Sequence, residues 1–567
     1  MNNRAVFYTL LVVFIALSCV AGFKYYKSIS GKKILNTSIN SAYVEPVIGL
    51  YNRNNKDEEI KADDFHHIVL NITESTSDEE VQRSLATLSD TKLNLITIKT
   101  FANDESNVLQ RTVDGNFDSK IKNICSALAK VNQPVYLRWN PEMEVPVTLY
   151  PWQYNSPILY SEAFRQFSKF SKKLLPNATI VWGPAGYPGS EEYWPGNDVV
   201  DLITLTINSK SELQATGYPP VQDMTVSLKR KIHRMRFMDK PILILGAEDT
   251  NANTLAKQFL PNAIREIQRE QSTIYATVGS KPSLAKPVAT INSKPIIGVY
   301  DPKQQLIRTK PVEVEHLFVN LGNIEEGVFL KEFTAITARK HDIILTVEPW
   351  RSKNYKEGDN VLLNAINGEY DPIFKKLYSI LAATNQTVYL RFAHEMEIPI
   401  ERYAWQSKDP VLYIKAFRYF MNYSSPKLKN VKRIWGPAGD RGSVEWWPGS
   451  DVVDYVSIAI YGLPDKNITD PKKQESFSTI YTRKHHRMYF ADKPIFVTEF
   501  GVKGPEDLQM KWLEDAANVI NQHPEIVGAC YFNLADNPKA WGKIPAPDWS
   551  ISHDTFISFS KKLISRQ

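Results

Sequence analysis

The chain contains two long segments that repeat each other. The stretch "WGPAGYPGSEEYWPGNDVVD" at Trp182 matches "WGPAGDRGSVEWWPGSDVVD" at Trp435 at about fifteen of twenty positions. Likewise, "VYLRWNPEME" at Val135 pairs with "VYLRFAHEME" at Val388. Each copy is about 250 residues long, which is too long for a solenoid repeat and typical of one (β/α)8 barrel. The duplication therefore predicts two tandem domains of the same architecture.

Short β-rich runs alternate with amphipathic stretches inside each copy. In the second copy, eight runs from "IIGVY" at Ile296 to "GACYFN" at Gly528 read as strands, most of them separated by helical patterns. The predicted fold class is α/β, with two tandem TIM barrels, and a doubly wound sheet is the structural alternative. We expect a degenerate barrel over 43–285 and a catalytic barrel over 286–567, joined near the Pro- and Ser-containing stretch Gly279–Pro295.

Residues 1–42 form a different region. The apolar run Ala5–Phe23 is just long enough to span a bilayer and is flanked by Arg4 and Lys24. It predicts a signal anchor with a short cytoplasmic tip, a linker and an extracytoplasmic globular part, either periplasmic or at the cell surface. A cleaved signal peptide and a lipoprotein anchored at Cys19 are the alternatives. The larger positive charge after the run favours the opposite orientation, so the two signals conflict.

Composition excludes several classes of protein. Lys and Arg outnumber Asp and Glu by only 68 to 62, and the basic residues form no long run, so nucleic acid is not a predicted partner. Of three cysteines, Cys125 and Cys530 lie in patterns of a helix and a strand and are expected to be buried thiols. His485 and His486 lie in a basic run that is predicted to be helical, without carboxylate or Cys partners at metal-ligand spacing. The sequence predicts no metal site and no cofactor.

Acidic and aromatic residues follow the predicted strands of the second copy. In a TIM barrel, functional side chains lie at the carboxyl ends of the strands. Glu348 follows the third strand, Glu395 the fourth, Tyr461 the sixth and Glu499 the seventh. Glu395 and Glu499 are 104 residues apart, which is close to three βα units. If strand alternation continues, both carboxylates face the barrel mouth, as the two carboxylates of a retaining glycosidase must.

The second copy resembles glycoside hydrolase family 26, a β-mannanase family of retaining barrel enzymes. The resemblance rests on "RFAHEME", on "IWGPAG" with "WWPGSDVVDYVSIAIYG", and on "KPIFVTEFG". It implies that Glu395 is the acid/base, Glu499 the nucleophile, His394 a neighbour that orients the acid/base and binds sugar, and Tyr461 the hydrogen-bond partner of the nucleophile. Glu397 departs from the Asn that is usual in the family, so mannan, mixed-linkage β-glucan and β-1,3-xylan all stay open as substrates.

Further residues are expected to contact substrate. Aromatic rings can stack on the apolar faces of sugar rings, although about half of the tryptophans of this copy are expected to belong to the core. Trp350 and Trp446 are the favoured stacking platforms. The predicted substrate-binding set is His394, Arg391, Tyr461, Glu348, Trp350, Trp405, Trp446 and Tyr531.

The corresponding positions of the first copy have changed together. Glu142 and Arg138 are retained, but the positions of His394, Tyr461, Glu348 and Glu499 are taken by Pro141, Asn208, Lys99 and Gly246. Without a nucleophile no glycosyl intermediate can form, so the first domain is expected to be non-catalytic. A nucleophile shifted to Glu248 is the alternative.

These observations predict an endo-β-glycanase that hydrolyses β-linked polysaccharide with retention in its C-terminal barrel. The rival is a non-hydrolytic protein that binds glycan or assists exopolysaccharide assembly and uses both barrels as grooves. Transglycosylation by the same two carboxylates is a third possibility. The sequence leaves the oligomeric state open.

Overall fold

The computed structural model describes most of the chain beyond its first 43 residues. The described residues are 44–53, 64–102, 107–146, 149–207, 223–246, 251–270, 294–351, 360–399, 403–463, 473–538 and 545–564. The predicted membrane segment Ala5–Phe23, with Cys19, lies outside them, as do Asn208, Glu248 and most of the predicted linker. None of the helices in the described ranges is long and apolar enough to cross a membrane.

The chain divides into two compact units whose limits differ from those of the sequence copies. The first unit comprises 1–185, 195–208 and 240–253, and the second comprises 186–194, 209–239 and 254–567. Three pieces of the first copy thus belong to the second unit. The predicted boundary at 285 falls within 271–293, outside the described residues.

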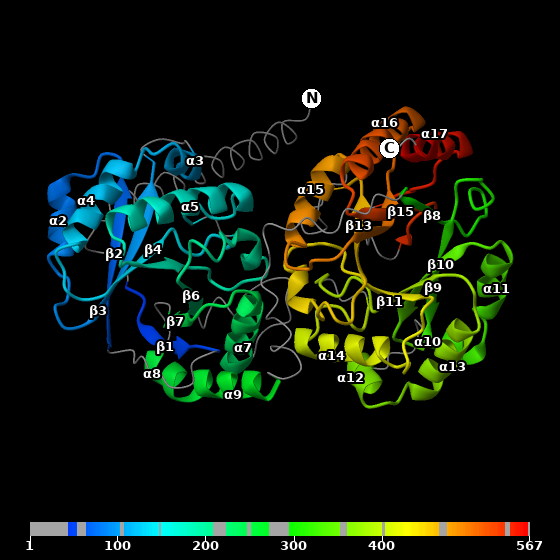
Figure 1. The fold of residues 1–567 in the computed structure, drawn as a ribbon, viewed down its shortest axis with the longest axis horizontal. Helices are drawn as coiled ribbons and strands as arrows, with labels where there is room; N and C mark the ends of the chain where they lie inside the picture. Colours follow the sequence, from blue (N-terminus) through cyan, green and yellow to red (C-terminus); the bar gives the residue numbers. More distant parts are fainter. Residues whose placement is uncertain are drawn as a thin grey trace, which may run out of the picture. The chain divides into compact units, whose positions relative to one another are not determined.

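The second unit contains a closed parallel barrel of eight strands (Figure 1). The strands are β8 (Ile296–Tyr300), β9 (Val314–Asn320), β10 (Asp342–Glu348), β11 (Val388–Phe392), β12 (Val431–Trp435), β13 (Tyr455–Tyr461), β14 (Ile495–Gly501) and β15 (Ile526–Phe532). β15 pairs in parallel with β8 and so closes the ring. This confirms the predicted (β/α)8 barrel of the second copy.

Helices surround this barrel on its outside (Figure 1). They are α10 (Leu321–Glu326), α11 (Leu330–Ala338), α12 (Val361–Ile366), α13 (Asp371–Ala382), α14 (Pro410–Met421), α15 (Phe477–Arg487), α16 (Glu506–Gln522) and α17 (His553–Ile564). α15 contains the basic run with His485 and His486, as predicted. From the first copy, α7 (Met224–Arg234) and α9 (Leu260–Glu270) also belong to this unit, with the 3-10 helices η3 (Ser190–Tyr193) and η4 (Met235–Phe237) and the π-helix η5 (Leu255–Phe259).

The first unit contains a seven-stranded sheet in the order β1-β7-β6-β5-β4-β3-β2. The strands are β1 (Val47–Tyr51), β2 (Phe65–Thr73), β3 (Leu93–Phe101), β4 (Val135–Trp139), β5 (Thr179–Trp182), β6 (Leu202–Ile207) and β7 (Ile242–Gly246). Its helices are α2 (Asp78–Leu85), α3 (Val108–Val113), α4 (Asp118–Leu128) and α5 (Pro157–Leu174), and α8 (Ala252–Thr254) begins at its edge.

The prediction of an eight-stranded parallel barrel is wrong for the described part of this unit. β2 to β7 are parallel, but β1 runs antiparallel to β7 and does not pair with β2. No eighth strand lies between β7 and β1 in the described ranges. β1 therefore pairs directly with the backbone N–H and C=O groups at the edge of β7. Residues of β1, β2, β3 and β5 to β7 still share one hydrophobic core.

Buried apolar side chains fill both sheets. The core of the barrel draws on β9, β10, β11, β12, β14 and β15, and it includes the thiol of Cys530. Cys125, on α4, is also free and fully buried. The prediction that both cysteines are core thiols is therefore confirmed.

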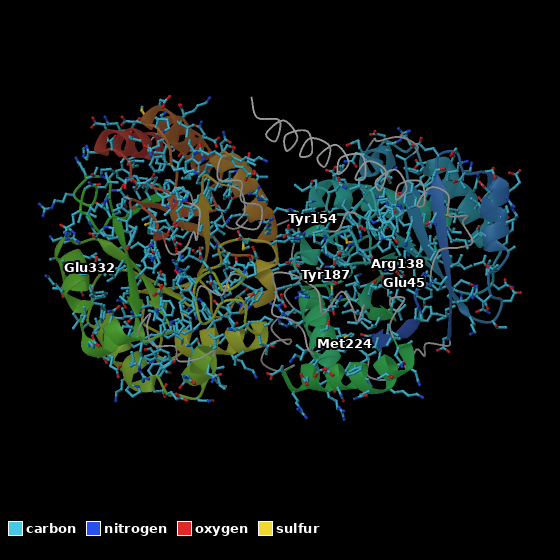
Figure 2. All side chains as sticks on the ribbon, turned by 180° about the vertical axis from the view of Figure 1, so that it is seen from behind. Glu45, Arg138, Tyr154, Tyr187, Met224 and Glu332 are labelled. Carbon is cyan, nitrogen blue, oxygen red and sulfur yellow. The ribbon has the colours of Figure 1, made fainter. Side chains whose placement is uncertain are left out.

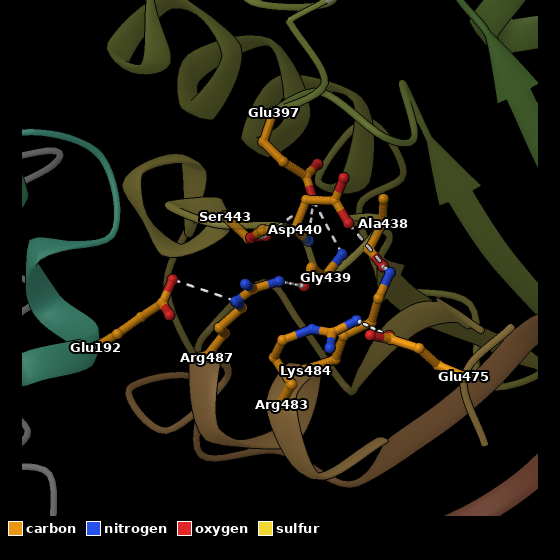
Figure 3. A network of polar contacts seen from close by, with 10 residues as sticks. All are labelled: Glu192, Glu397, Ala438, Gly439, Asp440, Ser443, Glu475, Arg483, Lys484 and Arg487. Atoms are coloured by element: carbon orange, nitrogen blue, oxygen red, sulfur yellow. Dashed lines mark hydrogen bonds and ion pairs between the residues drawn. The ribbon is translucent and has the colours of Figure 1, made fainter. Parts of the chain in front are cut away.

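A polar network in the second unit joins the loop after β12 to α15 (Figure 3). Lys484 donates to the carbonyl of Ala438 at 2.7 Å and pairs with Asp440 at 3.2 Å. Arg487 of the same helix pairs with Glu192 of η3 at 3.3 Å. At the equivalent positions, Arg234 of α7 pairs with Glu445 at 3.1 Å. These buried ion pairs attach the pieces of the first copy to the second unit.

Candidate active site

The acidic residues predicted from the sequence lie at the carboxyl edge of the barrel. Glu348 is the last residue of β10, Tyr461 is the last residue of β13, and Glu499 lies near the end of β14. Glu395 follows β11 by three residues. Because these strands are parallel and belong to one closed ring, their ends surround one mouth.

Arg391 of β11 connects three strands beneath this mouth. Its guanidinium is 1% exposed and donates to Thr346 at 2.8 Å, to Thr498 at 2.9 Å and to the Oε1 atom of Glu499. Gly436 leaves room for the arginine, since a Cβ there would lie 2.4 Å from Arg391 Cδ. The guanidinium fixes the position of the Glu499 carboxyl group.

Thr498 and Glu499 reach Arg391 although they are consecutive residues. The pairing register of β14 shifts between Val497 and Phe500, and that of β13 shifts at the same level. Such an irregularity turns neighbouring side chains toward one side. The strand alternation expected from the sequence is therefore the wrong reason for the orientation of Glu499.

Tyr461 holds the second oxygen of Glu499. Its hydroxyl donates to Oε2 at 3.0 Å. Burial raises the pKa of Tyr461 well above its ordinary value, and the negative charges of Glu499 and Glu395 raise it further. The phenol thus stays protonated as a donor, and its environment contains both candidate carboxylates.

Glu395 is placed by a turn and not by a continued strand. β11 ends at Phe392, and Ala393 and Glu395 have left-handed backbones with φ of 49° and 52°. The N–H of Glu395 donates to the carbonyl of Gly436 at 2.8 Å, and Gln406 donates to the Glu395 carbonyl at 3.1 Å. Non-glycine residues adopt this conformation at a cost, which is common at functional sites. The expected strand continuation from Arg391 to Glu395 is wrong.

His394 lies behind this turn among aromatic rings. Its imidazole is 2% exposed and has ring-centroid distances of 5.7 Å to Phe318 and 5.2 Å to Tyr403. Its carbonyl accepts a hydrogen bond from the Trp405 indole at 2.7 Å. Orientation of Glu395 and direct sugar binding by His394 both stay predictions.

Glu348 contributes a third carboxylate to the mouth. Its Oε2 atom accepts a hydrogen bond from the Trp350 indole at 3.0 Å. Nearby, burial raises the pKa of Tyr300 to about 12, and the charges of Glu332, Glu499 and Glu348 add to this shift. Sequence reasoning missed Tyr300, which ends β8 and could have been found by the same strand-end rule.

Three of the predicted sugar-binding aromatic residues are core residues instead. Trp405 and Tyr531 are completely buried, and Trp446 is 1% exposed. Trp405 stacks on Tyr403 at 4.6 Å, and the hydroxyl of Tyr531 donates to the carbonyl of Trp549 at 2.7 Å. A ring with both faces packed cannot stack on a sugar, so these predictions are corrected. Trp350 is half-buried and stays a candidate platform.

Glu397, two residues after Glu395, belongs to the polar network of Figure 3. Its Oε1 atom accepts hydrogen bonds from the Gly439 and Asp440 N–H groups at 2.9 and 3.2 Å and from the Ser443 hydroxyl at 2.8 Å. Burial and the nearby charge of Asp440 raise the pKa of Glu397 to about 7. Glu397 thus ties the turn that contains Glu395 to the loop after β12.

The first unit keeps the backbone frame of this site, with Arg138 and Glu142, but has other residues at the remaining predicted positions. The N–H of Glu142 donates to the carbonyl of Gly183 at 2.7 Å. Lys99 donates to the hydroxyl of Tyr150 at 2.9 Å, and β7 ends at Gly246. Arg138 nevertheless has a carboxylate partner, Glu45, and both are labelled in Figure 2. Sequence reasoning missed Glu45, because the repeat gives it no functional counterpart.

No group of three or more His, Cys, Asp or Glu side chains in the described ranges is arranged to hold a metal ion.

Comparison with known proteins gives partial matches. No family model matches the chain. Two β-1,3-xylanases, from an Alcaligenes species and a Vibrio species, are 29% and 30% identical to it over 105 residues. The match covers 17% of this chain and 21% and 22% of those proteins, so the chain spans about a fifth of the length of these curated relatives.

Similar solved structures include glycan-degrading enzymes. GH26C from a Muricauda species is 12% identical, over 43% of this chain and 80% of that one, with a TM-score of 0.34. A β-mannanase from a symbiotic protist of the termite Reticulitermes speratus, complexed with gluco-manno-oligosaccharide, is 14% identical, over 52% and 91%, with a TM-score of 0.30. A fungal β-1,4-galactanase is 14% identical, over 48% and 100%, with a TM-score of 0.34. With scores this low, the function has to be argued from the site.

The buried carboxyl of Glu397 predicts a pH-dependent stability. Between pH 4.5 and 7 the unfolded chain releases a proton that the folded chain keeps, so this group lowers the free energy of unfolding as the pH rises. The loss should approach about 3 kcal/mol by pH 8. Glu397→Gln should remove this pH-dependent loss of stability. In thermal midpoints measured from pH 4 to 8, the midpoint of the variant should therefore rise relative to that of the wild type as the pH increases. A constant difference across this range would contradict the prediction.

Proposed function

We propose that the second unit is a retaining endo-β-glycanase that hydrolyses β-linked polysaccharide. One observation carries the proposal: both oxygens of Glu499 are held, one by Arg391 and one by Tyr461, while Glu395 follows β11 at the same barrel mouth. A carboxylate held by two donors in this way is oriented for attack, as a nucleophile must be. A second carboxylate near it supplies the proton donor of a double displacement.

The proposed reaction has two steps. An oxygen of Glu499 attacks the anomeric carbon, and the bond to the leaving sugar breaks as Glu395 donates its proton to the leaving oxygen. Glu395 then removes a proton from water, which attacks the glycosyl ester and releases Glu499. Arg391 and Tyr461 stabilise the Glu499 carboxylate before the first step and after the second.

The proposed substrate class is broader than one sugar. The curated relatives are β-1,3-xylanases, and a structural neighbour is a β-mannanase that binds gluco-manno-oligosaccharide. Glu397 stands where the family has Asn and accepts its hydrogen bonds from the loop after β12, so the family residue does not guide the choice of sugar. We therefore propose mannan, mixed-linkage β-glucan and β-1,3-xylan as the substrates to test.

A non-hydrolytic glycan-binding protein, for instance in exopolysaccharide assembly, is the second candidate. It is favoured by the first unit, where Lys99 and Gly246 replace the acidic residues at two strand ends. Binding without release of reducing ends would distinguish it from the hydrolase.

Removing either carboxylate should impair hydrolysis by the second unit in different ways. Glu499→Gln should remove the contribution of the second unit to the release of reducing ends, because the proposed mechanism has no other nucleophile there. Glu395→Gln should lower activity on polysaccharide by about 10²- to 10⁴-fold. With aryl glycosides whose leaving group needs no proton it should spare the first step and slow only the hydrolysis of the glycosyl ester. Glu514→Gln, an exposed carboxylate on α16, is the control. Equal activity in all four proteins would refute the proposal.

A methyl group behind Arg391 should also impair the site. In Gly436→Ala the new Cβ would lie 2.4 Å from Arg391 Cδ, so the guanidinium must leave its position beside Glu499. We expect kcat/KM to fall by about 10²-fold, as for other displacements of about 1 Å. Gly183→Ala places a methyl 2.6 Å from Arg138 Nε and is the matched control for the first unit. Equal losses in both variants would contradict the assignment of hydrolysis to the second unit.

A further inference from the structure

The reversed strand of the first unit brings a new carboxylate to the strand end that lost one. Because β1 is antiparallel to β7, the beginning of β1 lies beside the carboxyl end of β7. The N–H of Gly246 donates to the carbonyl of Pro46 at 2.8 Å. Glu45, the residue before Pro46, therefore lies next to the position where the second unit has Glu499.

The pair formed by Glu45 and Arg138 resembles the pair formed by Glu499 and Arg391. The guanidinium of Arg138 is fully buried and that of Arg391 is 1% exposed. The carboxylate side chains of Glu45 and Glu499 are 12% and 9% exposed. In both units a buried arginine, on β4 in the first and on β11 in the second, thus pairs with a carboxylate that is partly exposed to solvent.

The backbone around Glu142 also matches that around Glu395. The two residues have φ of 60° and 52° and donate to Gly183 and Gly436 at 2.7 and 2.8 Å. Gln153 donates to the Glu142 carbonyl at 3.1 Å, the same distance as from Gln406 to Glu395. The acid/base frame of the first unit is therefore intact.

We propose that the first unit is a second glycoside-cleaving centre, with Glu45 as its nucleophile and Glu142 as its acid/base. The inference rests on the chemistry proposed for the second unit but concerns a separate site. It replaces the expectation that the first domain is non-catalytic, and it assigns to Glu45 the role that was considered for Glu248.

The charges around Glu45 suit this role. Burial alone would raise the pKa of Glu45, but Arg138, with smaller contributions from His67 and Lys99, brings it below its ordinary value. Glu45 is therefore ionised at neutral pH, as a nucleophile must be. The nearby positive charge of Lys99, in place of Glu348, weakens the attacking carboxylate, so this centre should be slower than the second unit.

The reaction balances with the groups present and water. An oxygen of Glu45 bonds to the anomeric carbon while the bond to the leaving oxygen breaks, and that oxygen takes the proton of Glu142. Water then gives a proton to Glu142 and its oxygen to the anomeric carbon. The ester breaks, and Glu45 leaves as a carboxylate.

Covalent trapping in the full chain tests both sites at once. The probes are the 2,4-dinitrophenyl 2-deoxy-2-fluoro-β-cellobioside and β-mannobioside, whose glycosyl-enzyme esters hydrolyse slowly, and the labelled residue is identified by peptide mass spectrometry. In Glu499→Gln we expect one label per chain, on the peptide with Glu45, and none in Glu45→Gln/Glu499→Gln. Label on Glu499 but never on Glu45 would overturn this inference and leave the proposed function standing. Absence of both labels would overturn both.

A charge-conserving variant separates the loss of the nucleophile from the loss of the ion pair with Arg138. Glu45→Gln leaves the buried Arg138 without its ion pair and can destabilise the unit. Glu45→Asp keeps the charge but withdraws the carboxylate by one methylene, so its labelling rate should fall about 10²-fold with little change in the thermal midpoint. Unchanged labelling in Glu45→Asp, or label on Glu142, would refute the role of Glu45.

Discussion

A buried guanidinium that needs a carboxylate is the constraint around which both units are organised. Arg391 is 1% exposed, and its charge would be costly to bury without Glu499. Its other hydrogen bonds reach Thr346 and Thr498, so the arginine also ties β10, β11 and β14 together. Gly436 is required because any side chain there would occupy the space of the arginine stem. The charge of the site and the packing of the strands therefore depend on the same residue.

The first unit meets the same constraint by a different route. Its β7 ends at Gly246, so the sheet itself offers Arg138 no carboxylate at that position. The reversal of β1 supplies one, because an antiparallel strand begins at the edge where the parallel strands end. One change of strand direction thus accounts for both the open seven-stranded sheet and the partner of Arg138.

The predictable parts of the site are those that depend on spacing along the chain. Strand-end position and a separation of about three βα units were enough to select Glu395, Glu499 and Tyr461. The reasons for their orientation were not predictable. Glu499 depends on an irregularity in β14, and Glu395 depends on a left-handed turn. Both features depend on how neighbouring strands pair. The periodicity of apolar residues in the sequence carries no information about that pairing.

The aromatic residues show the same limit. An indole suits a sugar platform and a hydrophobic core equally well, so the sequence could not separate Trp350 from the buried Trp405 and Trp446. The sequence by itself determined the duplication, the order of strands and helices in the second copy, and which carboxylates end its strands, because these follow from repeat length and local pattern. Only the tertiary structure decided the direction of β1, the burial of the rings and the pairing of Arg138 with Glu45. Those outcomes depend on which strand edges and buried charges find partners across distant parts of the chain.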